Sequence, residues 1–510
     1  MSTSASSVVE LLEVGTPDGP ALSTPGGIAL SYQGLRSLVG NTLESLNAMG
    51  IGRNDRVAIV LDNGAEMAAA FVSIAAAATA APLNPGYRTD EFNFYLSDLR
   101  AKLLVIESGK ASPAVNVADS LNIPVARLVA QPERGAGSFE LHFPQGYVAG
   151  TPARTGASAP DDIALVLHTS GTTARPKLVP LMHRNICASA HHIRHTLAFT
   201  AQDRGLNIMP LFHIHGLIAG MLAPLSAGGE ICCTPGFSAL KFFGWMSQVR
   251  PTWYTGVPTM HQAILARAAR NADVIKANPL RFIRSSSSSM PAQVIRELEQ
   301  VFGTAVIEAY SMTEAAHQMT SNSLPPGKRI PGSVGVAAGP EVCVLDASGN
   351  LLPAGVAGEV AIRGPNVMSG YENNPQANAQ AFVNGWFRTG DQGVMDCEGY
   401  LTISGRLKEI IIRGGEKISP REVDEVLMNH PAVQQCLTFA VPHEKLGEDV
   451  AAVIVLRESA TASEDQLREF AATRLADFKV PRKIIFRDEI PKGATGKPQR
   501  IGLAQKLGLA

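Results

Sequence analysis

The stretch IALVLHTSGTTARPK, residues 163–177, joins the two signals from which the fold can be predicted. Its first half, IALVLH, is a short apolar and β-branched run of the kind that forms a buried strand. Its second half, TSGTTARPK, is rich in hydroxyl groups, contains Gly171 and ends on Lys177. A loop that follows a strand of an open α/β sheet is a common ligand site. The stretch therefore predicts an α/β fold with a polar loop at the end of a strand.

Segments of helical and strand character alternate around this stretch. Residues 31–50 carry apolar side chains at helical spacing, at Leu35, Leu38, Val39, Leu43 and Leu46. Residues 55–61 and 101–107 are short candidates for buried strands. The alanine-rich run 67–83 falls short of the ~20 strongly apolar residues that a membrane span needs, and it predicts a buried helix. This alternation predicts a largely parallel sheet with helices on both faces.

The composition and the predicted secondary structure change twice toward the C-terminus. Beyond about Gly332, glycines separate short β runs, which predicts a β-rich subdomain with tight turns. From about Gly405, the predicted strands and helices are short and the charges are denser. We therefore predict a large N-terminal domain, residues 1–404, of α/β layers plus the β-rich subdomain. A small α+β C-terminal domain follows, residues 405–510, with the junction at about 405–408.

Composition excludes several classes of partner. The 44 Lys and Arg residues and 45 Asp and Glu residues leave a net charge of −1, which predicts neither nucleic-acid binding nor attraction to a membrane. None of the six cysteines forms a C-x-x-C pair, so buried free thiols are expected rather than a zinc ribbon. Signal-peptide and peroxisomal patterns are absent, which favours the cytoplasm, without a membrane span. The sequence does not indicate the oligomeric state.

The polar loop has the chemistry of a phosphate site. Its hydroxyl groups and backbone N–H groups can surround an anion, and Gly171 permits a close approach. Lys177 adds a positive charge. The pattern is not a Walker A loop, because Pro176 precedes the lysine and Leu178 follows it. Taken alone, the loop fits a polar surface turn equally well.

Five further motifs in fixed order settle the family. They are PLFHIHGL (210–217), EAYSMTEA (308–315), WFRTGD (386–391), GRLKEIIIRGGEK (405–417) and PKGATGKPQR (491–500). With the opening loop they resemble the adenylate-forming acyl-CoA synthetase superfamily over most of the chain. The resemblance implies that a carboxylate attacks the α-phosphate of MgATP, which releases pyrophosphate. The thiolate of coenzyme A then attacks the acyl-adenylate and releases AMP.

The resemblance assigns roles to matching residues. Lys497, Thr313 and Glu314 would be catalytic, with Glu314 holding Mg²⁺, because a hard cation prefers carboxylate oxygens. Lys408 would be the hinge about which a mobile C-terminal domain rotates. Gly414, Gly415 and Lys417 would face coenzyme A, although Lys417 fits a surface lysine almost as well. The residues implied to bind ATP or AMP are Thr169, Ser170, Gly171, Thr172, Thr173, Lys177, Ser288, Glu308, Ala309, Tyr310, Thr313, Asp391, Arg406 and Lys497.

The acyl pocket is implied to contain His213, His215, Ser287 and His317. Hydroxyl and imidazole groups suit a small polar acid with a second carboxylate better than a long apolar chain. The flanking sequences most resemble the oxalate–CoA ligase branch, which implies oxalate as the carboxylate. Malonate, an aryl-acrylate and a medium-chain acid remain alternatives, as does a protein that senses the nucleotide without forming a thioester.

Several local sequence patterns can be interpreted in two ways. Five consecutive serines, residues 285–289, usually form a flexible linker, but the flanking strand and helix signals favour an ordered loop. His191 and His195 lie one helical turn apart, yet no third metal ligand is evident, so a solvated helix face is favoured. Ala174 and Leu178 stand where the family usually has glycine, which changes the expected shape of the loop.

Overall fold

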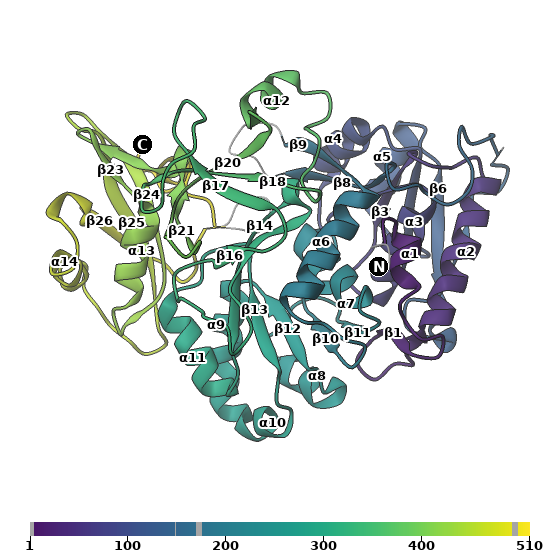
Figure 1. Cartoon of the computed structure of the whole chain (residues 1–510), viewed down its shortest axis with the longest axis horizontal. Coiled ribbons are helices and arrows are strands. Elements are labelled where there is room, and N and C mark those ends of the chain that lie inside the picture. The colour runs from purple at the N-terminus through teal and green to yellow at the C-terminus, as the bar shows by residue number, and fades with distance from the viewer. Residues whose placement is uncertain (1–4, 148, 170–175, 492–497) are drawn as a thin grey trace.

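The computed structural model describes residues 5–147, 149–169, 176–491 and 498–510. These residues form four β-sheets of seven, nine, five and five strands. Figure 1 shows the N-terminal elements at the right of the view and the small C-terminal sheet at the left. Within the described residues, no helix is long and apolar enough to cross a membrane.

The first large sheet has seven strands, with five parallel strands between two antiparallel edges. From edge to edge they are β7 (Phe139–His142), β6 (Val125–Ala130), β5 (Leu103–Glu107), β3 (Arg56–Val60), β4 (Thr79–Pro82), β8 (Ile163–Thr169) and β9 (Lys177–Met182). Strand β8 runs parallel to β4, as the sequence predicted, and β9 returns antiparallel beside it. Thr169 and Lys177 are therefore cross-strand partners at one end of the β8–β9 pair.

The second large sheet has nine strands, of which the six from β14 to β1 are parallel. In spatial order they are β16 (Val336–Ala337), β15 (His317–Ser321), β14 (Val306–Met312), β13 (Phe282–Ser285), β12 (Trp253–Gly256), β10 (Arg204–Asn207), β11 (Glu230–Cys233), β1 (Pro20–Ser23) and β2 (Leu30–Ser31). Strand β13 lies between β12 and β14, so its backbone is paired on both edges, and all four of its residues are buried.

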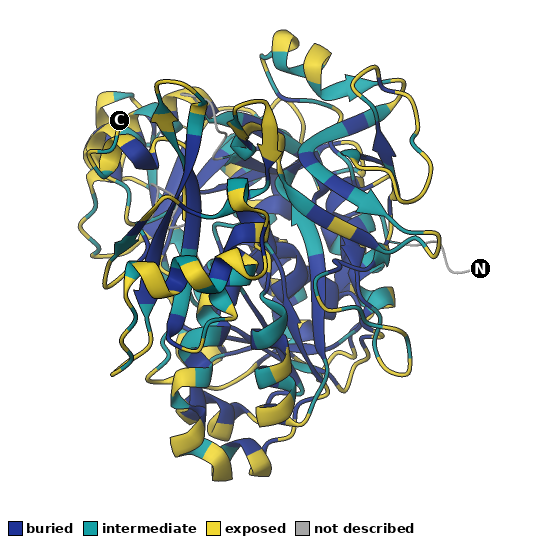
Figure 2. Cartoon of the chain, turned by 90° about the vertical axis from the view of Figure 1, so that its left-hand side faces the viewer, coloured by how far each residue is buried: buried dark blue, intermediate teal, exposed yellow. Residues whose placement is uncertain are grey.

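One layer of helices packs between the two large sheets, because a single apolar core joins both. This layer contains α1 (Val8–Leu12), α2 (Tyr32–Ala48), α3 (Ala65–Ala77), α6 (His183–Thr196), the π-helix η2 (His215–Leu222) and α7 (Ala223–Leu225). The outer face of the first sheet carries α4 (Thr89–Leu99) and α5 (Pro113–Ser120). The outer face of the second carries α8 (Phe242–Val249), α9 (Pro258–Ala268), α10 (Ala272–Ala277) and α11 (Ala292–Phe302). Figure 2 shows the resulting contrast between buried strands and helices with exposed outer faces.

The two smaller sheets follow in the chain. The first is antiparallel, with β17 (Glu341–Leu345), β18 (Gly358–Arg363), β20 (Trp386–Met395) and β19 (Phe382–Val383) in order, β21 (Leu401–Arg406) beside β20, and α12 (Pro375–Ala381) before β19. The second contains β23 (Glu416–Ile418), β22 (Ile411–Arg413), β25 (Gly447–Leu456), β24 (Val433–His443) and β26 (Lys483–Phe486), with α13 (Pro420–Met428), α14 (Glu464–Ala472) and α15 (Leu503–Lys506). The predicted fold class, α/β layers, a β-rich subdomain and a small α+β unit, is confirmed.

The predicted boundary between residues 404 and 405 falls inside β21. A hydrogen bond crosses this boundary: the Arg421 Nη1 group donates to the carbonyl oxygen of Ile403 at 2.6 Å. Glu409 of η5 (Leu407–Glu409) lies 3.4 Å from Arg500 near the C-terminus. The position of the boundary and the hinge role of Lys408 stay predictions.

Two sequence predictions need correction. The alanine-rich run does not form one helix, because α3 ends at Ala77 and Thr79–Pro82 enter the sheet as β4. The Thr79 hydroxyl there donates to the carbonyl oxygen of Ile163, which joins β4 to β8. The cysteines are also not uniformly buried, since Cys397 is exposed. The remaining short helices are η1 (Pro132–Arg134), η3 (Ala269–Asn271), η4 (Thr313–Ala315) and η6 (Asp477–Lys479).

Candidate active site

The five serines form an anchored loop between β13 and α11. Ser285 ends β13, and the Ser286 hydroxyl donates a 2.9 Å hydrogen bond to the carbonyl oxygen of Ala309. At the other end, the backbone N–H of Met290 donates to Glu308 Oε1 at 3.0 Å. Ser287 adopts a positive φ of 72°, a conformation that costs energy for any residue with a Cβ. The anchored ends hold Ser287 in this turn, beside the carboxyl ends of two parallel strands.

The carboxylate of Glu314, the phenol of Tyr371 and the ammonium group of Lys177 lie together after the end of β14. Glu314 lies in η4, directly after β14, and its Oε1 accepts a 2.8 Å hydrogen bond from the Tyr371 hydroxyl. The Lys177 Nζ lies 4.4 Å from the centroid of the same tyrosine ring. Burial raises the pKa of Glu314 above its ordinary value, while the bond from Tyr371 and the positive charges of Arg406 and Lys177 lower it. The predicted metal ligand and the predicted phosphate lysine thus share one partner, Tyr371.

A second cluster joins three of the predicted nucleotide residues. The Tyr310 hydroxyl donates a hydrogen bond to Asp391 Oδ2. The Arg406 Nε lies 3.4 Å from Asp391 Oδ1, because β20 and β21 pair these two residues directly. Burial raises the pKa of Asp391, and the neighbouring Arg406 opposes that rise. A carboxylate held in this way suits the hydroxyl groups of a ribose.

Three of the four predicted acyl-pocket residues lie together. Nδ1 of His215 is 3.0 Å from the Ser287 Oγ, and its Nε2 is 2.7 Å from the Thr255 Oγ1. The rings of His215 and His317 stack with centroids 4.8 Å apart at 28°. His215, at the start of η2, therefore connects the serine loop to β15, which His317 begins. The fourth residue, His213, packs its ring beside Phe212 at 4.7 Å.

Arg284 and Gln318 belong to the same cluster of side chains, and the sequence analysis did not assign either residue. The Arg284 Nη1 lies 3.1 Å from His317 Nε2 and 3.4 Å from His215 Nε2, and its Nη2 donates to Gln318 Oε1 at 3.2 Å. All of these side chains are buried. A signal for Arg284 was present, because an arginine inside an otherwise apolar strand next to the pocket serines needs partners.

The residues predicted for coenzyme A lie on a separate hairpin. Gly414 and Gly415 form the turn between β22 and β23 with φ values of 59° and 92°, and Lys417 is exposed on β23. Within the described residues, no hydrogen bond or ion pair joins Gly414, Gly415 or Lys417 to the clusters around Glu314 and Asp391. Burial lowers the pKa of Lys177, the attraction of Glu314 opposes this shift, and the positive charge of the exposed Lys408 adds to it.

Other predicted residues are placed less directly. Ser170, Gly171, Thr172, Thr173 and Lys497 lie outside the described residues. Thr169 ends β8, Thr313 begins η4, Ser288 is exposed in the serine loop, and Ala309 is buried on β14.

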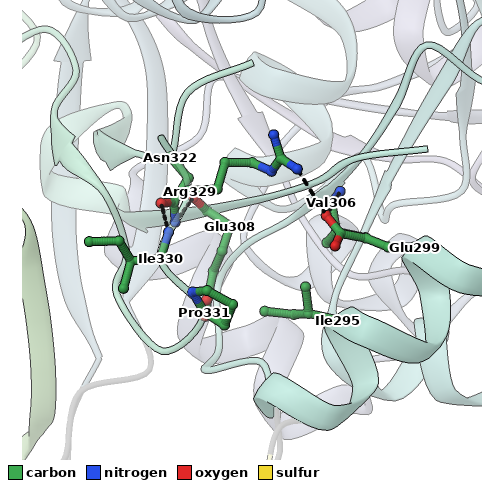
Figure 3. A pocket seen from close by; sticks show the side chains of 8 residues that line it. All are labelled: Ile295, Glu299, Val306, Glu308, Asn322, Arg329, Ile330 and Pro331. Carbon is green, nitrogen blue, oxygen red and sulfur yellow. Dashed lines mark hydrogen bonds and ion pairs between the residues drawn. The ribbon is translucent and has the colours of Figure 1, made fainter. Parts of the chain in front are cut away.

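Glu308 is buried, and a small cavity adjoins it. It lines a cavity of about 70 Å³ that also contains Asn322, Arg329 and Pro331 (Figure 3). Burial raises the pKa of Glu308 to about 7, and its Oε2 has no hydrogen-bond partner among the described residues.

Two family comparisons decide the assignment. The AMP-binding enzyme family matches residues 13–372, and the AMP-binding enzyme C-terminal domain matches residues 422–497. The chain belongs to the AMP-binding enzyme family. The first match contains the opening loop and the EAYSMTEA motif, and the second ends at Lys497.

Full-length relatives place the chain within this family. It is 43% identical to the oxalate–CoA ligase of Arabidopsis thaliana over 99% of this chain and 98% of that one. It is 41% identical to the oxalate–CoA ligase of Saccharomyces cerevisiae, over 89% and 87%. The ATP-bound structure of MatB from Rhodopseudomonas palustris covers 98% of both chains, at 30% identity and a TM-score of 0.87. The predicted resemblance is confirmed, and the chain is an AMP-forming acyl-CoA ligase.

Proposed function

We propose that this ligase joins oxalate to coenzyme A through an oxalyl-adenylate and releases AMP and pyrophosphate. One observation carries the choice of acid. The side chains of His215, Ser287 and His317 form a polar cluster that contacts the buried guanidinium of Arg284. A long or aromatic acid would bring apolar surface beside the buried guanidinium without balancing its charge, which costs free energy, whereas a second carboxylate would balance it. The similarity to two oxalate–CoA ligases supports the same choice.

The first half-reaction brings two anions together, so positive charge must be concentrated around the phosphates. Lys177 is held beside Tyr371 and is proposed to bind the leaving pyrophosphate. Lys497 is proposed to bridge the attacking carboxylate and the α-phosphate. Asp391 and Arg406, with the ring of Tyr310, are proposed to bind the ribose and adenine.

The residues present fit a magnesium ion. Among the described residues, no group of three or more His, Cys, Asp or Glu could hold a metal, and Glu314 is the carboxylate proposed to hold the ion. This arrangement is the usual one for Mg²⁺, which keeps waters and phosphate oxygens and takes one or two carboxylates from the protein. When bound, the ion would neutralise charge on the phosphates, while Tyr371 holds the Glu314 carboxylate in place.

In the second half-reaction, the hairpin with Gly414 and Gly415 is proposed to approach the pantetheine chain of coenzyme A. Both glycines are exposed at the tip of the hairpin, where the backbone carries no side chain to block the thiol arm. Movement about Lys408 would exchange this hairpin for the segment that carries Lys497.

The substrate is tested by AMP release in the presence of coenzyme A with oxalate, malonate, 4-coumarate and octanoate. Oxalate is expected to give the highest kcat/KM. A higher kcat/KM with malonate or octanoate would show that the choice of acid is wrong. Oxalate without coenzyme A should support pyrophosphate exchange but no net thioester.

The role of Lys497 is tested by separating the two half-reactions. Lys497→Ala should abolish oxalate-dependent pyrophosphate exchange and largely preserve thioester formation from supplied oxalyl-adenylate. Lys492→Ala, in the same segment, is the matched control and should preserve both. Equal loss of both steps in Lys497→Ala would exclude the proposed role.

A further inference from the structure

Arg284 carries a buried positive charge without an acidic partner. Arg284 lies on the interior strand β13 and is 0% exposed. Among the described residues, no Asp or Glu forms an ion pair with it. Its contacts are two imidazoles and the amide oxygen of Gln318, and its Nε has no hydrogen-bond partner in that part of the chain. A cation in such surroundings is expensive unless an anion balances it.

The charge persists at neutral pH. Burial lowers the pKa of Arg284 to about 9, so the guanidinium still holds its proton. A methionine or leucine would fill the same space on a buried strand without this cost. An arginine here therefore indicates that a negative charge enters the neighbouring pocket when the substrate binds.

Arg284 also determines the protonation of the two histidines. A guanidinium only donates hydrogen bonds, so the Nε2 atoms that face it, on His215 and His317, must be acceptors. Each neutral ring then carries its proton on Nδ1. His215 Nδ1–H donates to the Ser287 Oγ, which leaves the serine hydroxyl proton available to a ligand.

Thr255 supports the same tautomer. It is the direct cross-strand neighbour of Arg284, and its hydroxyl lies 2.7 Å from His215 Nε2. Since that nitrogen accepts from Arg284, the Thr255 hydroxyl donates to it as well. Two donors thus hold the imidazole in one tautomer.

We propose that Arg284 is a positioning and specificity residue: it fixes the tautomers of His215 and His317, and its unbalanced charge selects acids with a second anionic group. This inference rests on the proposed function at the same pocket. It adds a reason for the selectivity that does not require Arg284 to touch the substrate. The distal carboxylate keeps its charge throughout the reaction, so Arg284 should act on substrate binding rather than on the chemical step.

Oxamate provides the matched probe, because it replaces the distal carboxylate of oxalate with a neutral carboxamide of the same shape. The full-length enzyme is expected to prefer oxalate strongly. Arg284→Met should raise the KM for oxalate on the order of 100-fold, leave its kcat within about fivefold, and alter kcat/KM for oxamate by no more than about fivefold. Arg284→Lys keeps the charge and should retain a clear preference for oxalate.

Gln318→Glu tests the charge without removing the arginine. The new carboxylate would occupy the position of the amide that already accepts from Arg284, and would balance the guanidinium. We expect the oxalate-to-oxamate preference to fall as it does in Arg284→Met. Thermal stabilisation by AMP checks that each variant is folded, and the lysine and glutamate variants carry the test where the methionine variant fails that check.

The outcomes separate the two proposals. An unchanged oxalate-to-oxamate preference in folded Arg284→Met or Gln318→Glu would overturn the inference, with the proposed function intact. A parallel loss of kcat with both acids would assign Arg284 a structural role only, and would also overturn it. Absence of oxalate turnover in the parent enzyme would overturn the proposed function itself, and the inference that rests on it.

Discussion

The Tyr371 hydroxyl donates a 2.8 Å hydrogen bond to Glu314 Oε1, and Lys177 lies over the ring of the same tyrosine. A single phenol therefore orients the carboxylate proposed for the metal and packs against the lysine proposed for the pyrophosphate. Partners of this kind fix a ligand's direction and raise its affinity, although they do not touch the metal.

Tyr371→Phe should weaken the use of MgATP. Removal of the hydroxyl leaves Glu314 buried with one fewer donor, and we expect the Mg²⁺ concentration for half-maximal pyrophosphate exchange to rise about tenfold. The ring remains, so the contact with Lys177 should persist. Tyr147→Phe is the control, because its hydroxyl bonds the carbonyl oxygen of Met49, in another part of the chain from Glu314. An unchanged Mg²⁺ requirement would show that Tyr371 does not support the metal.

The elements that the sequence predicted well are those with local signals. Helix α2 follows from its apolar spacing, and α14 begins after Ser463, which caps it, with Gln466 bonded back to the cap. The run 67–83 was misassigned because alanine is compatible with both a buried helix and a buried strand. The change occurs at Ala78, which has an extended conformation that no neighbouring residue type announces.

The residues of the candidate site also divide into those with a local sequence signal and those without one. Glu314, Asp391 and His317 were identified from motifs, since their neighbours in the sequence are distinctive. Tyr371 and Arg284 were not, because their partners lie far away in the chain: Tyr371 meets Glu314 across 57 residues, and Arg284 meets His215 across 69. Such pairings depend on how the layers stack, and no spacing in the sequence encodes them.

Asp162→Asn should destabilise the N-terminal part of the protein. Asp162 is buried and accepts hydrogen bonds from Arg53 Nε at 2.6 Å, from Asn54 Nδ2 at 2.7 Å and from the backbone of Ala159 at 2.6 Å. Neutralising it leaves Arg53 without its close carboxylate, and we expect a loss of about 3 kcal/mol in the free energy of unfolding. Chemical denaturation followed by fluorescence measures this loss.

The adjacent residue provides the control for this prediction. Asp161 pairs with Arg184 at 2.7 Å, but both side chains are more than half exposed. Asp161→Asn should therefore change the free energy of unfolding by less than about 1 kcal/mol. Burial opposes ionisation of Asp162, yet its bonds from Arg53, Ala159 and Asn54 hold its pKa below the ordinary value. As the pH falls through this lowered pKa, Asp162 takes up a proton and loses its stabilising charge. The difference in the free energy of unfolding between Asp162→Asn and Asp161→Asn should then shrink.

Glu308→Gln should stabilise the protein at neutral pH and not in mild acid. Burial raises the pKa of Glu308 from 4.5 to about 7. Below about pH 4.5 the Glu308 carboxyl is protonated in both the folded and the unfolded state. Between about pH 4.5 and pH 7 it is protonated in the folded state alone. The parent therefore loses stability as the pH rises through this window, by about 3 kcal/mol, and the glutamine variant does not.

Thermal melting at pH 5 and pH 8 measures this effect. The advantage of Glu308→Gln over the parent should be larger at pH 8. Glu133→Gln, at an exposed position, controls for the loss of one negative charge. An equal advantage at both pH values would mean that Glu308 is ionised in the folded protein throughout, and that its pocket solvates the carboxylate.

Arg500→Met should slow the first half-reaction selectively. Arg500 lies three residues after Lys497. Its Nη2 donates to Asp424 Oδ2 at 2.6 Å, and its Nε lies 3.4 Å from Glu409 in η5. It thereby ties the segment that follows Lys497 to α13 and to the predicted hinge. Small misplacements of a reacting group are costly, so we expect oxalate-dependent pyrophosphate exchange to fall on the order of tenfold.

Thioester formation from supplied oxalyl-adenylate should change by less than about threefold, because that step is proposed to use the hairpin of Gly414 and Gly415. Arg487→Met is the matched control, since Arg487 is exposed and its side chain bonds the neighbouring carbonyl oxygen of Phe486. Loss of both steps in Arg500→Met would point to a folding defect, because Asp424 would then be buried without its cation. Preservation of both would mean that the segment of Lys497 is positioned by other contacts, and that the link from Arg500 to Glu409 has no part in adenylation.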